Sequence, residues 1–535
     1  MTFFCENCGQ KLPSDARFCE NCGCRISYEK DDSDIVASCE NNLSLFAERN
    51  WEGAWKALLS DGKYEACGII LTNTSDCPEN LKDEFRRTVS EYISCKSQAG
   101  VCYCVLDMAT QSVKNSLFGN SLSDVGFLVK VLKEICKIAA PKYLLILGDR
   151  SCIGSAKWEN LLNDPDGDSD AFVDSDLPYV ALNAESPFEG GSRAFCLDVG
   201  RIPSVAKNGF REACAYLKNA MNYEECTYSS SFALSAKEWE TVSRVNFRNA
   251  SPEFYTCPPF TLVEEMRQYQ FDVLPNDNRH NLLCFNLHGS PTHHYWLSGD
   301  GTLAYSPKCL PNGNDIGYVL CTEACYGAKP IISEDGDQSI LISALAGHCL
   351  GFVGSTQIAY GLPDVALLHG GSPCCADILI GEFATRVANG DSLGDAYMRA
   401  LSAMTENRST LKGEEIKTIA SFGLYGDPSL RLIRGGNRKS AASQTESKSF
   451  HIPMPDVRRA VYTKLVAVSH QLSEIMNEAI AKFYNGMENV TPRYYAVSGY
   501  DGYKAACKKE TSHTSDVLSI YFDKNGNIEE VYVSK

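Results

Sequence analysis

Positive charge is scarce in this chain: 50 Lys and Arg stand against 67 Asp and Glu in 535 residues, which leaves a formal net charge of −17. Nucleic-acid-binding proteins normally present a basic face, so we expect no nucleic-acid partner. Long apolar runs are also lacking, and no stretch of about 18 apolar residues predicts a membrane span. The start, MTFFCE, has no basic segment followed by an apolar one, so no secretory signal is predicted. We therefore expect a cytoplasmic protein.

Cysteine, in contrast, is abundant, with 25 residues. A disulfide framework is typical of small secreted domains rather than of a chain of this length. We therefore expect reduced thiols, most of them serving as small buried hydrophobic residues. Apolar residues make up 44% of the chain, which is enough for a large core. At about 100–200 residues per domain, the length predicts two to four domains.

The N-terminal segment CENCGQKLPSDARFCENCG contains two CxxCG motifs. Cys5 and Cys8 form the first pair, and Cys19 and Cys22 form the second. Four thiolates at this spacing can surround one zinc ion tetrahedrally, and a site filled by four protein ligands is structural rather than catalytic. The alternative is a redox CxxC, but the doubled motif favours zinc. The segment resembles the short zinc-ribbon domains at the front of many bacterial proteins, and Cys24 is a fifth thiol outside the predicted ligand set.

Apolar runs alternate with helical patterns through the middle of the chain. Short continuous apolar runs, which suit buried parallel strands, lie at 68–71, 101–106, 143–147, 282–287 and 316–321. Helices are predicted at 125–138, 339–346 and 376–404. This alternation predicts an α/β fold with a mostly parallel sheet and helices on both faces.

The last part of the chain follows a polar, glycine- and serine-containing linker. Apolar residues at helical spacing predict a helix over 461–483. Two apolar runs, 517–522 and 528–533, flank Asn525-Gly526, which is a strong hairpin signal. We therefore predict a small C-terminal α+β domain.

Two expected strands end in residues that carry chemistry. His288 follows the first in LLCFNLHGS, and Cys325 follows the second in GYVLCTEACYG. A cysteine peptidase needs a thiolate near a histidine that accepts and returns a proton, with backbone donors for the oxyanion. The amides of Gly289 and Cys325 are candidate donors. From the residues alone, a buried structural cysteine and a hydrogen-bonded histidine remain an equal alternative.

Several motifs in this region occur in the order seen in a known family. They are LLILGD at 144–149, SDLPY at 175–179, DVGRIPS at 198–204, HGS at 288–290 followed by Trp296, and GDPSL at 426–430. The chain resembles the caspase-like (caspase–hemoglobinase) superfamily, and within it the gingipain peptidase family. Glu323-Ala324-Cys325 is similar to the legumain nucleophile motif, and the gingipain secretion signal is lacking.

The resemblance implies a bacterial, intracellular cysteine endopeptidase acting on protein or peptide substrates. Cys325 would be the nucleophile and His288 the general base and acid, and no third member of the dyad is predicted. The expected division is 1–27 zinc ribbon, 28–63 linker and helical segment, 64–433 peptidase domain, 434–451 flexible linker and 452–535 small α+β domain. The ribbon and the C-terminal domain are expected to dock regulatory partners. The alternative is a non-catalytic caspase-like adaptor.

An acidic run, NDPDGDSDAFVDSD, places carboxylates at Asp164, Asp166, Asp168 and Asp170. Such clusters can bind calcium, as gingipain-like domains do, but the glycine position and the lack of a closing glutamate do not fit an EF-hand loop. A solvated acidic loop is the favoured interpretation. An acidic field would concentrate basic substrates, so cleavage after Arg or Lys is expected. Legumains, which share the EAC motif, prefer asparagine.

Overall fold

A computed structural model gives the architecture over a defined part of the chain. The described residues are 3–4, 11–12, 66–109, 124–138, 141–164, 167–188, 194–204, 209–222, 227–228, 231–250, 254–257, 280–299, 301–311, 317–332, 336–406, 408, 410–434, 452–453, 458–460, 463–483, 487, 489–510 and 514–535. The predicted zinc ligands, the helical segment before residue 64, Asp166 and residues 435–451 of the predicted linker lie outside this set.

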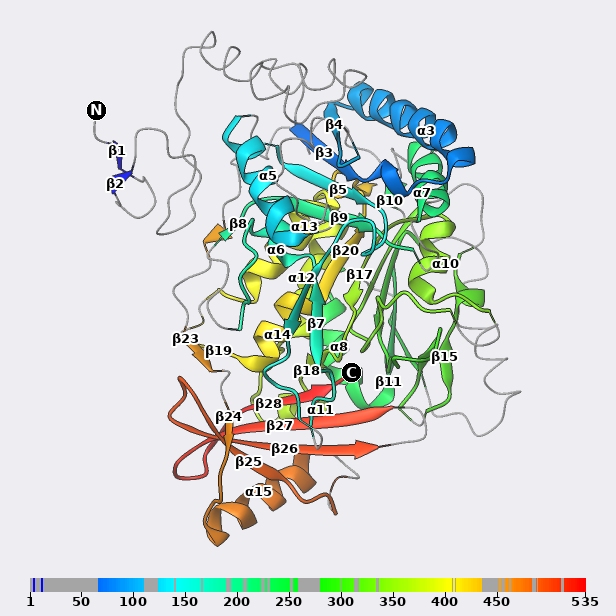
Figure 1. Cartoon of the computed structure of the whole chain (residues 1–535). Coiled ribbons are helices and arrows are strands. Elements are labelled where there is room, and N and C mark those ends of the chain that lie inside the picture. Colours follow the sequence, from blue (N-terminus) through cyan, green and yellow to red (C-terminus); the bar gives the residue numbers. More distant parts are fainter. Residues whose placement is uncertain are drawn as a thin grey trace.

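A ten-stranded sheet forms the centre of the molecule (Figure 1). It has two parallel halves of five strands, which meet antiparallel where β17 pairs with β20. In sheet order the first half is β12 (Phe254–Cys257), β11 (Ser231–Ala236), β13 (Leu282–Asn286), β16 (Tyr318–Thr322) and β17 (Cys349–Ser355). The second is β20 (Phe422–Gly426), β9 (Asp198–Ile202), β5 (Tyr143–Leu147), β3 (Ala66–Thr72) and β4 (Val101–Asp107).

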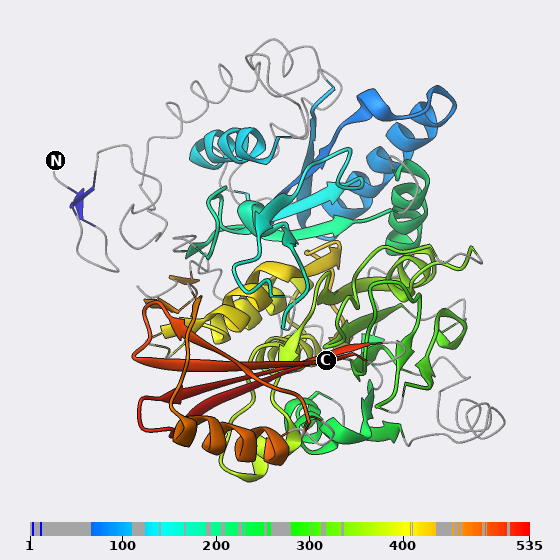
Figure 2. The same ribbon diagram turned by 60° about the horizontal axis from the view of Figure 1, so that its bottom comes forward.

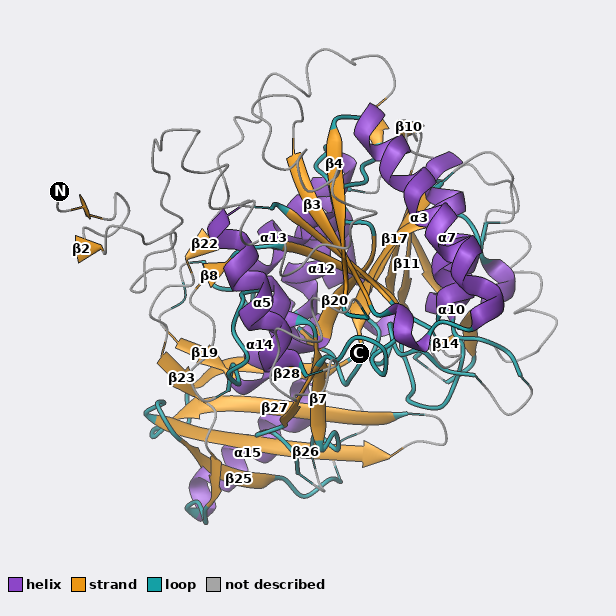
Figure 3. Ribbon diagram, turned by 45° about the horizontal axis from the view of Figure 1, so that its top comes forward, coloured by secondary structure: helices purple, strands orange, loops and turns teal. Residues whose placement is uncertain are grey.

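Helices cover both faces of this sheet, as Figure 3 shows. One face carries α3 (Glu79–Gln98), α7 (Phe210–Asn222) and α10 (Ile340–Ala346). The other carries α5 (Val125–Ile138), α6 (Leu177–Val180), α8 (Glu240–Phe247), α12 (Ala376–Ala388) and α13 (Leu393–Ala403). The α/β prediction is confirmed. The helical region predicted over 376–404 contains two helices, α12 and α13, because the chain turns at Gly390, whose φ is +94°.

Short elements complete this part of the chain. The helical ones are η2 (Thr74–Asp76), η3 (Lys237–Trp239), η4 (Pro307–Cys309), α11 (Asp364–Leu368) and α14 (Gly413–Ser421). The two-stranded ribbons pair β6 (Ala156–Glu159) with β7 (Phe172–Ser175), β8 (Ala194–Phe195) with β22 (Ile452–Pro453), β10 (Thr227–Tyr228) with β21 (Ile433–Arg434), β14 (Trp296–Leu297) with β15 (Leu303–Tyr305) and β19 (Thr410–Lys412) with β23 (Arg458–Ala460).

Two of the sequence motifs are held together by one buried ion pair. Arg201, from GRIP, has a side chain only 1% exposed. Its guanidinium makes two hydrogen bonds of 2.7 Å to the carboxylate of Asp176, from SDLPY. It also donates to the carbonyl of Gly148 at the end of β5. A bidentate pair fixes the relative orientation of the two side chains as well as pairing their charges. These contacts therefore hold the loop that contains Asp176 against the end of β5.

The C-terminal part is an antiparallel sheet with one helix against it (Figure 2). In sheet order it contains β28 (Ile528–Ser534), β27 (Ser515–Asp523), β26 (Gly502–Glu510), β25 (Arg493–Val497) and β24 (Thr463–Leu465), with α15 (His470–Phe483) beside it. The predicted hairpin is confirmed, with Gly526 at φ +89° in its turn. The helix predicted from residue 461 begins at His470, because residues 463–465 pair with β25 as a strand.

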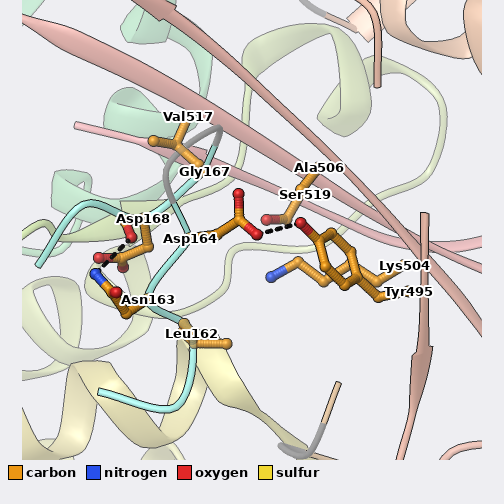
Figure 4. Close-up of a pocket in the computed structure, with 10 residues that line it drawn as sticks. All are labelled: Leu162, Asn163, Asp164, Gly167, Asp168, Tyr495, Lys504, Ala506, Val517 and Ser519. Carbon is orange, nitrogen blue, oxygen red and sulfur yellow. Dashed lines mark hydrogen bonds between the residues drawn. The ribbon is translucent and has the colours of Figure 1, made fainter. Parts of the chain in front are cut away.

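Buried charges join this C-terminal sheet to the central domain through α14, which is buried along its whole length. Glu414 accepts hydrogen bonds from Lys504 at 2.7 Å and from the Tyr521 hydroxyl at 2.8 Å. Nearby, Tyr495 donates to Asp164 at the rim of a small cavity of about 20 Å³ (Figure 4). Burying paired charges between two surfaces makes their separation costly.

Two carboxylates of the acidic run, Asp168 and Asp170, are buried, so the interpretation of the run as a solvated loop is wrong for them. Asp168 and Asp170 are 3% and 8% exposed. The ammonium of Lys417, on α14, contacts both of them, and its distance to Asp170 is 2.7 Å. Tyr360 donates to Asp168 at 2.7 Å and Tyr326 to Asp170 at 2.6 Å. A protein cation therefore pairs with both carboxylates and offsets part of their negative charge.

We predict that Lys417→Ala lowers the free energy of unfolding by about 3–5 kcal/mol, because two buried carboxylates lose their counter-charge. Urea unfolding followed by circular dichroism measures this loss. Lys218→Ala, which breaks a surface pair with Glu84, is the control and should leave the midpoint unchanged. An equal, small effect in both variants would contradict the account of a buried charge centre.

Candidate active site

The candidate site is built where three neighbouring parallel strands end. Residues Ser235 of β11 and Asn286 of β13 are paired in register, as are Phe285 of β13 and Thr322 of β16. The chain therefore leaves these strands at the same edge of the sheet. Glu238 lies just beyond β11, His288 just beyond β13 and Cys325 just beyond β16. In open α/β sheets, ligands bind at such carboxyl ends.

His288 is held from two sides. Its Nε2 atom lies 2.6 Å from Oε1 of Glu238, and its ring packs on Trp239 with centroids 4.3 Å apart. Gly299 leaves space for the carboxylate, since a Cβ there would lie 2.1 Å from Oε2 of Glu238. Burial opposes ionisation of Glu238, but the hydrogen bond and charge of His288 lower its pKa overall. The carboxylate therefore fixes the orientation of the imidazole ring.

Cys325 lies directly against the His-Gly turn. A Cβ on Gly289 would lie 1.6 Å from the carbonyl oxygen of Cys325, so only glycine permits this approach of the two backbones. The next residue, Tyr326, has a φ of +54°, a left-handed conformation that non-glycine residues seldom adopt. Its hydroxyl bond to Asp170 holds this strained turn. The buried charge centre of the acidic run thus shapes the turn that carries Cys325.

The sulfur of Cys325 is 3.5 Å from the carbonyl oxygen of Ala359 and accepts from its amide at 3.3 Å. Burial raises the pKa of the Cys325 thiol to about 12, although the Ala359 backbone contact opposes this shift. Within the described residues no hydrogen bond joins Cys325 to the His288 ring. In this arrangement the thiol is protonated at neutral pH.

A cavity of about 240 Å³ connects these groups. His288, Gly289 and Cys325 line it, together with Ser534 and Lys535 from the end of the chain. The amide of Cys325, one of the two predicted oxyanion donors, donates to the carbonyl oxygen of Lys535 at 2.9 Å. The structure thus brings together His288, Gly289 and Cys325, and it places the carbonyl oxygen of Lys535 on the Cys325 amide.

The side chain of Lys535 enters a closed acidic pocket beside the cavity. Its ammonium is 3.1 Å from Asp377 and 3.5 Å from Glu323, and it lies 4.6 Å above the Trp239 ring. All three charged side chains are fully buried. Burial, and then the charge of Asp377, raises the pKa of Glu323 well above its usual range. Gly361 forms one wall, since a Cβ there would lie 2.1 Å from Cε of Lys535.

Sequence reasoning missed Glu238, Asp377 and Trp239, and it named Glu323 only as part of a motif. Neither Glu238 nor Asp377 belongs to a recognisable sequence motif. The one signal for Glu238 is its position two residues beyond the end of β11. The other histidine that follows an apolar run, His369, ends α11 and packs against Phe483, away from the cavity.

The cysteines predicted to bind zinc lie outside the described residues. The described residues beside the first CxxC pair form a short hairpin in which β1 (Phe3–Phe4) pairs antiparallel with β2 (Lys11–Leu12). The predicted donor set of four thiols suits a structural zinc ion. Among the described residues, no cluster of His, Cys, Asp and Glu could hold a metal ion, and no disulfide joins the cysteines. None of the described helices is long and apolar enough to span a membrane.

We predict that Glu238→Gln lowers the kcat for peptide hydrolysis about 10–100-fold, because the carboxylate that orients the His288 ring is lost. Steady-state kinetics on a peptide substrate measure this loss, and a wild-type kcat in Glu238→Gln would contradict the orienting role. Glu240→Gln, two residues along the chain, removes a carboxylate that pairs with Lys237 and Arg244. It is the control and should behave as wild type.

Comparison with known families identifies the N-terminal domain. Residues 4–26 match the model of the zinc-ribbon domain family. This range includes all four predicted zinc ligands. No curated protein matches the chain. A solved structure described as "Structure of Protease" superposes with a TM-score of 0.45 and 12% sequence identity, covering 89% of this chain and 98% of that one. This TM-score is below one half, so the likeness carries no weight for fold or activity. The chain thus consists of an N-terminal zinc ribbon, an α/β domain with a mostly parallel sheet, and a C-terminal antiparallel sheet.

Proposed function

We propose that the protein is a cysteine endopeptidase in which Cys325 is the nucleophile and His288 the general base and acid. One observation carries the proposal: beside His288, the Cys325 amide donates to the carbonyl oxygen of Lys535, which directly follows the strand paired with β18 (Tyr360–Gly361). An oxyanion donor must lie within hydrogen-bond distance of that oxygen, and 2.9 Å meets this requirement. The caspase-like resemblance of the motifs supports the same reaction.

In this mechanism the Cys325 thiolate attacks the carbonyl carbon of the residue before the scissile bond. The carbonyl oxygen takes the negative charge and is stabilised by the Cys325 amide, with the Gly289 amide proposed as a second donor. His288 receives the thiol proton and returns it to the leaving amine, which breaks the peptide bond. Water, deprotonated by His288, then hydrolyses the thioester. Because Glu238 occupies Nε2, we assign the proton transfers to Nδ1.

We propose that cleavage follows a basic residue. The acidic pocket that takes Lys535 has two buried carboxylates and an aromatic ring at cation–π distance. A buried charge left unpaired costs several kcal/mol, so a pocket of this kind rejects neutral and acidic side chains. The basis of the preference differs from the expectation from sequence: Glu323 and Asp377 provide it, whereas the acidic run is paired with Lys417.

We propose that Cys5, Cys8, Cys19 and Cys22 hold one structural zinc ion and that the ribbon is a docking module for a protein partner. The ion would fix the two turns of a segment too short to form a core of its own. We further propose that the protein works in the cytoplasm, where the catalytic thiol would stay reduced.

Replacing Cys325 or His288 with Ala should reduce peptide cleavage about 10⁴-fold or more while leaving the far-ultraviolet circular dichroism unchanged. The measurement is turnover of a peptide library by purified protein. His369→Ala, which removes a histidine outside the cavity, should remain active. Wild-type turnover by Cys325→Ala on any substrate would show that another group is the nucleophile.

Specificity for basic residues should depend on Asp377. We expect a positional scanning library to show cleavage after Lys and Arg, and Asp377→Asn to lower kcat/KM for lysyl substrates about 100-fold. Glu382→Gln, a change of the same kind on the outer side of α12, is the matched control and should have no effect. Dominant cleavage after Asn or Asp, with Lys and Arg inert, would refute the assignment of this pocket.

Elemental analysis should find one zinc ion per chain, and the Cys5→Ser/Cys19→Ser double variant should lose it because two ligands cannot hold the ion tightly. Cys24→Ser should keep the metal. The α/β domain should remain folded in both variants, since its core lies elsewhere. Zinc retained by the double variant would overturn the ligand assignment.

A further inference from the structure

The end of the chain lies in the groove that a substrate would need. β28 pairs antiparallel with β18 (Tyr360–Gly361), with Ser534 opposite Tyr360 and Val533 opposite Gly361. The amide of Lys535 then donates to the Ala359 carbonyl at 3.0 Å. Adding an extended strand to a sheet edge is a common way to bind a peptide, with main-chain bonds for affinity and side-chain pockets for specificity. Figure 1 shows β28 beside β18.

Each contact that the proposed reaction requires is already taken by this segment. The Lys535 carbonyl occupies the Cys325 amide, and the Lys535 side chain fills the acidic pocket between Asp377 and Glu323. Cys325 is left only 4% exposed. Lys535 alone thus blocks the Cys325 thiol, the proposed oxyanion donor and the proposed specificity pocket.

We infer that the C-terminal segment from Ile528 to Lys535 is a built-in inhibitor that occupies the substrate groove in the manner of a bound product. The inference rests on the proposed peptidase function and adds its regulation. The segment is covalently tethered, so its effective concentration at the groove is on the order of millimolar and it competes strongly with substrates. Activity then depends on how often the segment leaves.

Release requires movement of the whole C-terminal sheet, because β28 lies inside it. Its second edge pairs with β27, and the amide of Val517 donates to the Ser534 hydroxyl at 2.8 Å. The sheet is fixed to the central domain through the buried pair of Lys504 and Glu414. The segment therefore cannot fray residue by residue, and a switch between closed and open states is expected.

The test compares the wild-type chain with its variants in the hydrolysis of the peptide VYVSK, which is coupled through its lysine to a fluorogenic amine. This substrate copies residues 531–535. Lys535→Glu places a negative charge against Glu323 and Asp377, so it should expel the segment and raise kcat/KM at least about 10-fold. Lys535→Arg keeps the cation and should stay closed. Lys524→Glu makes the same charge change in the exposed hairpin turn and should have no effect. A rate for Lys535→Glu at or below wild type would overturn the inference.

A binding measurement separates this inference from the peptidase proposal. In the Cys325→Ala background, fluorescein-labelled VYVSK should bind about 10-fold more tightly to the Lys535→Glu chain than to the chain with Lys535. Tighter binding without hydrolysis by any variant would support the inference that the segment is an inhibitor and would refute the peptidase proposal. Equal binding to the two chains would refute the inhibitor inference. If circular dichroism shows that Lys535→Glu is unfolded, Lys535→Ala takes its place in both measurements.

Discussion

The arrangement of the site depends on one geometric constraint: adjacent parallel strands end at the same edge of a sheet. The registers of β11, β13 and β16 bring Glu238, His288 and Cys325, residues far apart in the sequence, to one place. The close approach of the Gly289 backbone to the Cys325 backbone fixes the positions of these two strand ends relative to each other. No side chain could replace that glycine without moving Cys325.

Buried charge is the second organising feature of the molecule. Lys417 pairs with Asp168 and Asp170, and Asp170 in turn holds Tyr326 in its left-handed conformation beside Cys325. Lys535 pairs with Asp377 and Glu323 at the cavity. Ions buried in pairs are costly to separate, so the first centre is suited to permanent structure. In the proposed function, the side chain of a basic substrate residue takes the place of Lys535 in the second centre.

Much of this architecture is predictable from the sequence, for reasons that differ between elements. The apolar run at 143–147 and the helical pattern at 125–138 coincide with β5 and α5, because continuous burial and amphipathic periodicity are local properties. His288 and Cys325 are also identifiable, since each follows a buried run at a strand end. Glu238 and Asp377 are not, because their roles come from tertiary contacts. Lys535 gives no local signal at all, because its partners depend on how the C-terminal sheet docks.

The most direct test of the account is to identify the cysteine that reacts with a substrate-like inhibitor. Incubating the Lys535→Glu chain with a peptidyl-lysine acyloxymethyl ketone and mapping the adduct by mass spectrometry distinguishes Cys325 from the other 24 of the 25 cysteines. We expect a single adduct, on Cys325, that is lost in His288→Ala and absent with the corresponding peptidyl-aspartate reagent. An adduct on a different cysteine, or labelling spread over several cysteines, would contradict the assignment of this site.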